Sequence, residues 1–338
     1  MEPAKEVSPF LIFETMTAYQ SSYALAACIR LDLFTNIKPE GSTAEEIASA
    51  CGITEKGARV LADTMTVHEF LTKENKTYRL TEVSEKFLRK DSKAYLGGTA
   101  RFLLTPKLME GFRRIDEAAV KGGTVIEDEG TLGFEDPVWI DFAHGMMPMM
   151  MPSALAIADL LEYETDKPLM VLDIAASHGI FGLMIGQKYP NAQIYGVDWK
   201  NVLPVAEENA AKFGMSDRYH KIEGSAFEVE YGEGFDVALL TNFLHHFNAE
   251  TNTGLIKKIG ESLNPDGKII TLEFIPNEDR VSPPGEALFA SVMLASTPDG
   301  DAFTFNELDK MFKDAGFKNN RHIPLPPTPQ HLVVSTRE

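Results

Sequence analysis

Several features that would point to a function are scarce or absent in this chain of 338 residues. Only two cysteines occur, Cys28 and Cys51, and neither stands at a metal-ligand spacing, so zinc sites and structural disulfides are not expected. The 50 acidic residues outnumber the 32 basic ones, and without a basic cluster such a chain is repelled by nucleic acid. No apolar run approaches the ~20 residues of a membrane helix, and no signal-peptide pattern opens the sequence. These absences predict a cytoplasmic protein without nucleic-acid, membrane or metal partners.

From Leu169 onward, apolar strand patterns alternate with helical ones. Runs such as 171–175 and 236–240 are nearly all apolar, which is typical of a parallel sheet covered on both faces. This part of the sequence therefore predicts an α/β domain with a doubly wound, mostly parallel sheet. The expected strands are Leu169–Ala175, Gln193–Trp199, Tyr219–Glu223, Phe235–Leu244 and Gly267–Ile275, and the expected helices are Phe181–Lys188, Leu203–Phe213 and Thr251–Leu263.

The N-terminal part of the sequence predicts helices and very little strand. Thr43 and Glu46 have the spacing of a capping box, a second helix follows Thr54, and residues 72–81 predict a hairpin. This order of helix, turn, helix and hairpin is that of a winged helix. DNA-binding versions carry several basic residues on the second helix, whereas acidic residues balance them here.

The segment from Phe10 to Phe34 is apolar almost all round, yet an N-terminal helix has little of its own domain in which to be buried. A second subunit would cover it, and folding back on its own chain is the alternative. We expect a homodimer that forms through the N-terminal helices. Residues 1–98 are then the mainly helical, winged-helix dimerisation domain, and residues 99–338 the α/β domain.

The first strand of the α/β domain leads into a turn of small residues, 173–179. Ligands of such folds bind beyond the carboxyl ends of the strands. The turn lacks the G-x-G-x-x-G motif, and with it the usual cradle for a pyrophosphate. Asp198 ends the second strand, 19 residues after Gly179, where an acid can accept hydrogen bonds from both ribose hydroxyls. A nucleoside without a phosphate fits this pattern; alternatively, Asp173 and Asp198 only cap the helices that follow.

Three segments carry a resemblance to a known family: the turn 173–179, Gly196–Trp199 and Gly224–Phe227. Over nearly its full length, the chain resembles the bacterial members of the plant-type small-molecule O-methyltransferases, which use S-adenosylmethionine. The resemblance implies a Rossmann-like class I methyltransferase domain after the dimerisation domain. Ala175 and Ser177 replace glycines of the family loop, and Ser225 replaces an aspartate that contacts adenine. The implied cofactor site consists of Asp173, Ala175, Ser177, Gly179, Asp198, Trp199, Ser225, Ala226, Phe227 and Asn242.

The fourth strand leads into a pair of histidines, His245 and His246, where the family carries His-Asp-Trp. A phenol with a pKa near ~10 is mostly protonated at neutral pH, so a nearby base assists its methylation. The resemblance implies that His245 is this base and that Glu273 is the acid beside it, while His246 is interpreted as structural. The second acid of the plant enzymes is Ala302 here. Alternatively, His245 packs against the next helix and Glu273 is a solvated carboxylate at a strand end.

Apolar residues near the strand ends predict the pocket for the methyl acceptor. Aromatic residues and methionines gather in 139–151, a run that Pro148 interrupts, and the family's substrate-lining helix corresponds to the segment around 289–293. Methionine adapts to irregular apolar shapes, although such a run is more often plain core. We choose Phe142, Met146, Phe289 and Met293 as pocket residues. Their character favours a flat, small aromatic molecule that is methylated on a hydroxyl group.

Other functions compete with O-methylation. The same scaffold could bind S-adenosylmethionine or another small ligand and methylate nitrogen, carbon or sulfur, or catalyse a reaction without methyl transfer. A winged-helix regulator would need a basic face on its second helix, and a nicotinamide dehydrogenase would need the missing phosphate loop.

Overall fold

The computed structural model describes residues 7–127 and 129–337 of the chain. The chain divides into two compact units, and the boundary lies between Ala100 and Arg101. The assignment of residues 1–98 to dimerisation and of 99–338 to cofactor binding stays a prediction. Within the described residues, no helix combines the length and the apolar character that crossing a membrane requires.

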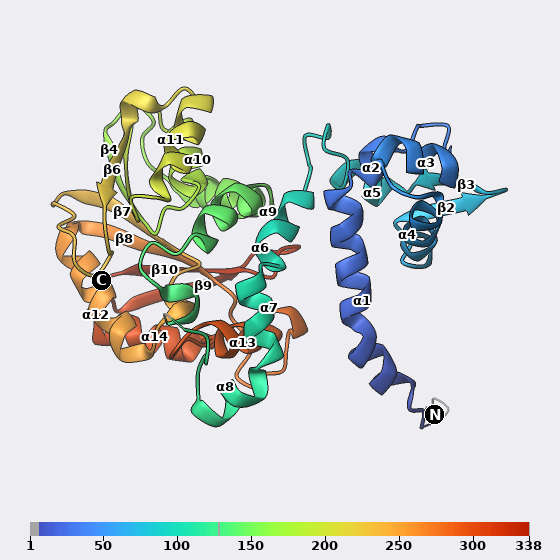
Figure 1. Cartoon of the computed structure of the whole chain (residues 1–338). Coiled ribbons are helices and arrows are strands. Elements are labelled where there is room, and N and C mark those ends of the chain that lie inside the picture. Colours follow the sequence, from blue (N-terminus) through green and yellow to red (C-terminus); the bar gives the residue numbers. More distant parts are fainter. Residues whose placement is uncertain (1–6, 128, 338) are drawn as a thin grey trace, which may run out of the picture. The chain divides into compact units, whose positions relative to one another are not determined.

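The first unit packs helices against a three-stranded sheet (Figure 1). The predicted capping box of Thr43 and Glu46 is present, and Thr54 caps the next helix. Ile47, Met65 and other apolar side chains form the core of this unit. Its elements are α1 (Phe10–Arg30), α2 (Leu33–Asn36), β1 (Ser42–Thr43), α3 (Ala44–Cys51), α4 (Glu55–Val67), β2 (Leu71–Glu74), β3 (Thr77–Leu80), α5 (Glu82–Phe87) and η1 (Gly97–Thr99), with the sheet order β1-β3-β2.

Helix α1 is shorter than expected and is exposed on all sides over its first half. The expected helix over 10–34 stops at Arg30, because Asp32 takes the left-handed conformation (φ 57°) before α2 begins. A continuous exposed apolar surface of this kind marks an interaction site in a soluble protein. The exposed side chains are Phe10, Leu11, Ile12, Phe13, Met16, Tyr19 and Tyr23.

The second unit is the α/β domain. Helices α6 (Ala100–Leu103), α7 (Pro106–Arg113), α8 (Ile115–Lys121), η2 (Gly130–Leu132) and α9 (Val138–Leu160) precede its sheet. The sheet and its helices are β4 (Leu169–Ile174), α10 (Ile180–Lys188), β5 (Ala192–Asp198), α11 (Leu203–Lys212), η3 (Ser216–Arg218), β6 (Tyr219–Glu223), β7 (Phe235–Thr241), η4 (Leu244–His246), α12 (Ala249–Ser262), β8 (Leu263–Glu273), α13 (Pro284–Ser296), α14 (Phe305–Asp314), β9 (Asn319–Pro324) and β10 (His331–Thr336).

The seven strands have the order β6-β5-β4-β7-β8-β10-β9. The first five of these are parallel, and β10 runs antiparallel to both β8 and β9. The chain moves outward from β4 through β5 to β6 and then returns to the other side of β4 with β7. The strand order thus reverses between β4 and β7, and a ligand crevice is expected at the carboxyl ends of these two strands.

Two apolar cores lie on opposite faces of this sheet. Along β4, Val171 contributes to the core under α9, α10 and α11, whereas its neighbour Leu172 contributes to the core under α12 and α14. Figure 1 shows these two helical layers with the sheet between them. Because successive residues of a strand face opposite sides, the nearly continuous apolar runs of the sequence fill both cores. The predicted doubly wound α/β class is confirmed.

Some elements differ from the expectation. Strand β7 ends at Thr241 instead of Leu244, because Asn242 is left-handed (φ 54°) and residues 244–246 form a 3-10 turn. Helix α9 continues through Pro148 and Pro152, so Pro148 does not divide the methionine-rich segment into two pieces. Strands β9 and β10 were not predicted.

Candidate functional site

The turn after β4 keeps an unusual backbone. Ala175, Ser177 and Gly179 all have positive φ values, 54°, 51° and 71°. Glycine adopts this conformation freely, whereas each L-residue with a side chain is strained by roughly 1–2 kcal/mol. The turn therefore has the alternating left-handed backbone that glycines would favour, although two of the three positions are not glycine. Strain of this kind is concentrated at ligand sites.

Asp198, at the end of β5, holds this turn in place. Its Oδ2 accepts a hydrogen bond from the Ser177 N–H (2.7 Å), and its Oδ1 accepts one from the Trp199 N–H (2.7 Å). The residue is half-buried, and its remaining surface lines a cavity. Burial raises the pKa of Asp198 to about 6, despite the two N–H donors. Each oxygen keeps a lone pair for a further donor.

Asp173 supports the turn from below. It is fully buried, and its Oδ2 accepts a hydrogen bond from the Gly182 N–H (3.2 Å) at the start of α10. Burial raises the pKa of Asp173 to about 8, so its carboxyl group is protonated at neutral pH. Gly179 precedes α10 as its N-cap. Among the described residues that line the cavity, neither Asp173 nor Gly179 occurs, so both shape the site indirectly.

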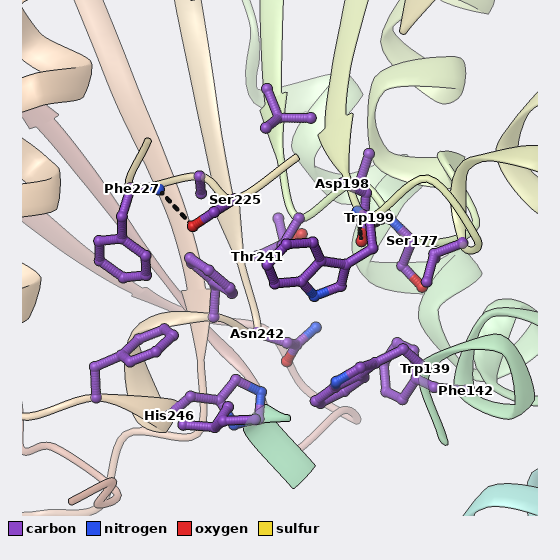
Figure 2. Close-up of a pocket in the computed structure, with 18 of the residues that line it drawn as sticks. Trp139, Phe142, Ser177, Asp198, Trp199, Ser225, Phe227, Thr241, Asn242 and His246 are labelled. Atoms are coloured by element: carbon purple, nitrogen blue, oxygen red, sulfur yellow. Dashed lines mark hydrogen bonds between the residues drawn. The ribbon is translucent and has the colours of Figure 1, made fainter. Parts of the chain in front are cut away.

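A cavity of about 430 Å³ opens at the carboxyl ends of β4, β5 and β7 (Figure 2). This volume is within the range of small-molecule sites. Figure 2 shows Asp198, Trp199, Ser225 and Phe227 around one part of the cavity and Trp139, Phe142 and His246 around the other. The lining residues are Glu129, Leu132, Trp139, Phe142, Ala175, Ala176, Ser177, His178, Phe181, Val197, Asp198, Trp199, Val202, Gly224, Ser225, Ala226, Phe227, Thr241, Asn242, Phe243, His246, Phe247, Asn248, Thr251, Pro298 and Asp299.

The loop after β6 forms an aromatic wall of the cavity. The Ser225 Oγ accepts a hydrogen bond from the Phe227 N–H (3.3 Å), which closes a tight turn. The Phe227 ring lies 4.9 Å from the Phe247 ring, measured between centroids. Lys258 of α12 fixes this loop from behind, because its Nζ donates to the carbonyl oxygens of Ala226 (3.2 Å) and Val229 (2.8 Å). This wall offers flat apolar surface to a planar ring.

His245 and Glu273 form a buried pair at the ends of β7 and β8. The Nδ1 of His245 lies 2.5 Å from Oε2 of Glu273. The other carboxylate oxygen accepts hydrogen bonds from the N–H groups of Phe243 (3.0 Å) and Leu244 (2.9 Å). In the neutral imidazole, an Nδ1 that donates to a carboxylate leaves the lone pair on Nε2. The predicted histidine and the predicted acid are thus in direct contact.

Two other histidines line the cavity, and the sequence assigned a binding role to neither. His246, which was interpreted as structural, lies 5.1 Å from Trp139 between ring centroids. Burial and the adjacent His245 lower its pKa well below the ordinary value, so its ring is neutral. His178 lies on the turn after β4, accepts the Ile180 N–H at Nδ1 (3.3 Å), and has its pKa lowered by burial to about 3. Its position in the turn of small residues, directly before Gly179, was the sequence feature that could have marked His178 as a cavity residue.

The four residues chosen for the methyl acceptor are not brought together. Phe142 lines the cavity, whereas Met146 lies in the core between α9 and the sheet. Phe289 packs on His245, with 4.8 Å between ring centroids, and Met293 is buried on the same helix. The signal that favoured Met146 was its apolar character, which core and pocket residues share.

The charges of the site suit a nucleoside that carries no phosphate. No Lys or Arg occurs among the described residues that line the cavity, whereas Glu129, Asp198 and Asp299 do. No group of three or more metal-ligating side chains was found within residues 7–127 and 129–337. The carboxylate of Asp198, the small turn and the aromatic wall fit the ribose and adenine of S-adenosylmethionine, and the acidic lining suits its sulfonium charge. A dinucleotide would place phosphates where nothing neutralises them.

Two family models match the chain. The model described as the O-methyltransferase domain matches residues 141–318, just over half of the chain. The model described as the O-methyltransferase dimerisation domain matches residues 13–90.

Individual relatives agree with these matches. A solved structure from Nostoc punctiforme, of a candidate O-methyltransferase, is 47% identical and has a TM-score of 0.94 over 97% of this chain and 99% of that one. The tetracenomycin polyketide synthesis 8-O-methyl transferase TcmO of Streptomyces glaucescens is 26% identical over 92% of this chain and 91% of its own length. The S-adenosyl-L-methionine-dependent methyl transferase PigF of Serratia sp. is 22% identical over 95% of this chain and 94% of its own.

Proposed function

The chain belongs to the S-adenosylmethionine-dependent O-methyltransferase family, and we propose that it methylates a hydroxyl group of a small aromatic molecule with His245 as the general base. The observation that carries this proposal is the buried contact between His245 and Glu273 at the sheet edge where the cavity opens. Neither residue is among the described residues that line the cavity, so the proposal requires that the acceptor reach His245 Nε2 past the lining. His245 lies in the 3-10 turn after β7, and Glu273 is the last residue of the neighbouring parallel strand β8, so the core of the domain determines where both lie.

In the proposed complex, Asp198 accepts hydrogen bonds from the ribose hydroxyls on the lone pairs that Ser177 and Trp199 leave free. Adenine lies against Phe227 and the turn at Ser225, and the left-handed turn at Ala175 allows the ligand close to the backbone. When bound, S-adenosylmethionine supplies the methyl group: the new O–C bond forms as the C–S bond breaks, and its electron pair stays on sulfur.

The pair of His245 and Glu273 handles the proton. Glu273 fixes the ring through Nδ1, so that Nε2 is the nitrogen that removes the hydroxyl proton. The carboxylate then stabilises the imidazolium that forms. Because donor and acceptor must be aligned for a displacement, holding both in one cavity supplies a large part of the rate.

A neutral aromatic acceptor is supported by the second part of the cavity. Trp139 and Phe142 present aromatic surface, with 5.7 Å between their ring centroids, and His178 and His246 are neutral. Methylation of nitrogen, carbon or sulfur, or binding without methyl transfer, is the alternative that the same scaffold allows. The identity of the methylated atom in the product decides between them.

We further propose that the protein is a homodimer through helix α1. The matched dimerisation domain and the exposed apolar side chains of α1, such as Phe10 and Phe13, support this arrangement. A second copy of the helix would bury surface that water otherwise covers unfavourably.

The test compares His245→Ala with His246→Ala. A panel of phenols and aromatic amines is incubated with labelled S-adenosylmethionine, and the binding of S-adenosylhomocysteine is measured by calorimetry. For His245→Ala we expect turnover to fall by ~10²-fold or more, with unchanged cofactor affinity and partial rescue by added imidazole. For His246→Ala we expect no rescue by imidazole. Full activity of His245→Ala would leave alignment alone as the source of catalysis, and turnover of amines but not phenols would support the alternative.

A further inference from the structure

A buried chain of hydrogen bonds reaches the cavity from outside it. Gln330 donates from Nε2 to Oδ1 of Asn242 (2.5 Å), and Ser153 donates from Oγ to Oε1 of Gln330 (3.0 Å). Ser153 belongs to α9 and Gln330 to the loop before β10, and both are buried, at 1% and 2% exposure. Asn242, directly after β7, is half-buried and lines the cavity. Neither Gln330 nor Ser153 is among the described lining residues.

Asn242 lies in the cavity wall between the two parts of the lining. Figure 2 shows its side chain between Asp198 and Trp199 on one side and Trp139 and His246 on the other. If the proposed function is correct, on which this inference rests, the methyl donor and the acceptor oxygen meet in this region.

The chemistry that Asn242 offers depends on which end of its amide faces the ligand. A carboxamide has a donating NH₂ group and an accepting oxygen, and a half-turn of the group exchanges them. Gln330 occupies the oxygen, so the Nδ2 end is left for the cavity. One N–H contacts the sulfur of Met150 at 3.6 Å, which is a weak acceptor, and one N–H is left for a ligand.

We propose that Gln330 is a positioning residue, which fixes the Asn242 amide so that its N–H donates to the acceptor oxygen as the phenol loses its proton. The Asn242 N–H stabilises the phenolate while His245 takes the proton. Its hydrogen bond occupies one lone pair of the phenolate oxygen and leaves another free on the side away from the amide. Without Gln330, the amide of Asn242 turns freely and presents an oxygen, which repels a phenolate, in part of the molecules.

The experiment uses 4-nitrophenol as the probe, because its phenolate absorbs visible light and reports its own protonation state. The probe is titrated against protein saturated with S-adenosylhomocysteine, at several pH values. Gln330→Met removes the donor at nearly constant volume, and Asn242→Gly removes the amide at a left-handed position that glycine adopts freely. Gln187→Met is the matched control, because Gln187 is exposed and bonds only to the carbonyl of Phe213 in the described chain.

For Gln330→Met we expect about 10-fold weaker binding of the probe and a higher pKa of the bound phenol, with cofactor affinity changed less than about threefold. In the Asn242→Gly background, Gln330→Met should have no further effect, because it acts through that amide. Ser153→Ala should lose less affinity for the probe than Gln330→Met, since it keeps the hydrogen bond between Gln330 and Asn242.

Three results with the variants would overturn the inference. The first is an unchanged pKa of the bound probe in Gln330→Met, and the second is an additive effect of the two substitutions, which a general structural role would produce. The third is an equal loss of probe and cofactor binding. Protein that binds S-adenosylhomocysteine but no 4-nitrophenol would refute the aromatic acceptor and this inference with it, whereas absent cofactor binding would refute the proposed cofactor.

Discussion

Binding of the cofactor should depend on pH through Asp198. In the free protein, burial raises the pKa of this carboxyl group to about 6, above the ordinary value of about 3.9 for aspartate. The native state therefore holds a proton that the unfolded state has lost between pH ~4 and ~6, so stability falls as the pH rises through this window. Ribose hydroxyls need the ionised form as their acceptor, so binding has the opposite dependence and weakens as the pH falls.

The magnitude follows from the fraction of ionised Asp198. If only the carboxylate binds, the apparent Kd is multiplied by one plus ten to the power of pKa minus pH, which is about 11 at pH 5 and about 1 at pH 7.5 for a pKa of about 6. We therefore expect affinity for S-adenosylhomocysteine to fall roughly tenfold between pH 7.5 and pH 5. Replacing the charged acceptor removes ~1.5–3 kcal/mol of hydrogen bonding, so Asp198→Asn should bind ~10- to 100-fold more weakly at pH 7.5.

Calorimetric titration at four pH values tests both statements. The dependence on pH should disappear in Asp198→Asn, because the amide does not titrate. A tenfold loss at pH 5 that persists in Asp198→Asn would place the titrating group elsewhere. Wild-type affinity in the variant would refute the assignment of the ribose to Asp198 altogether.

Three further substitutions test the framework of the site. The raised pKa of Asp173, about 8, makes the wild-type protein lose stability as the pH rises. The free energy of unfolding of Asp173→Asn, measured with urea, should therefore gain on that of the wild type by about 1.4 kcal/mol for each pH unit between pH 5 and 7. Parallel curves of stability against pH for the two proteins would contradict this. Ala175→Gly should stabilise by about 1 kcal/mol by relieving the left-handed strain at φ 54°, whereas Ala176→Gly in the same turn should destabilise. Phe13→Glu should yield monomers in light scattering, whereas Val83→Glu, which is exposed outside α1, should not; dimers in both would exclude α1 as the interface.

The sheet could be predicted because its buried parallel strands have a recognisable apolar pattern in the sequence. The apolar runs at Val171 and Val237 indicated buried parallel strands, and the spacing from Gly179 to Asp198 indicated the ligand edge. These features are local in sequence or repeat along the chain. The structure brings the predicted acid Glu273 to His245 because β7 and β8 are neighbours in the sheet.

Other parts of the site could not be predicted because they depend on the orientation of single turns. His245 and His246 are adjacent in sequence, and only the 3-10 turn after β7 determines that one ring contacts Glu273 while the other lines the cavity. Phe142 and Met146 lie one turn apart on α9, yet Phe142 lines the cavity and Met146 lies in the core. Gln330 is 88 residues from Asn242, and nothing in its local sequence marks it.

The side chains at the two left-handed, non-glycine positions of the turn after β4 affect stability more than they affect the shape of the site. Ala175 and Ser177 adopt the left-handed backbone that glycine favours, and the hydrogen bond from the Ser177 N–H to Asp198 offsets part of the strain. A side chain at either position is still small enough for the turn to border the cavity. The same carboxylate that would hold the ribose therefore also maintains the turn beside it. Loss of Asp198 should consequently weaken binding twice, by removing an acceptor and by releasing a strained loop.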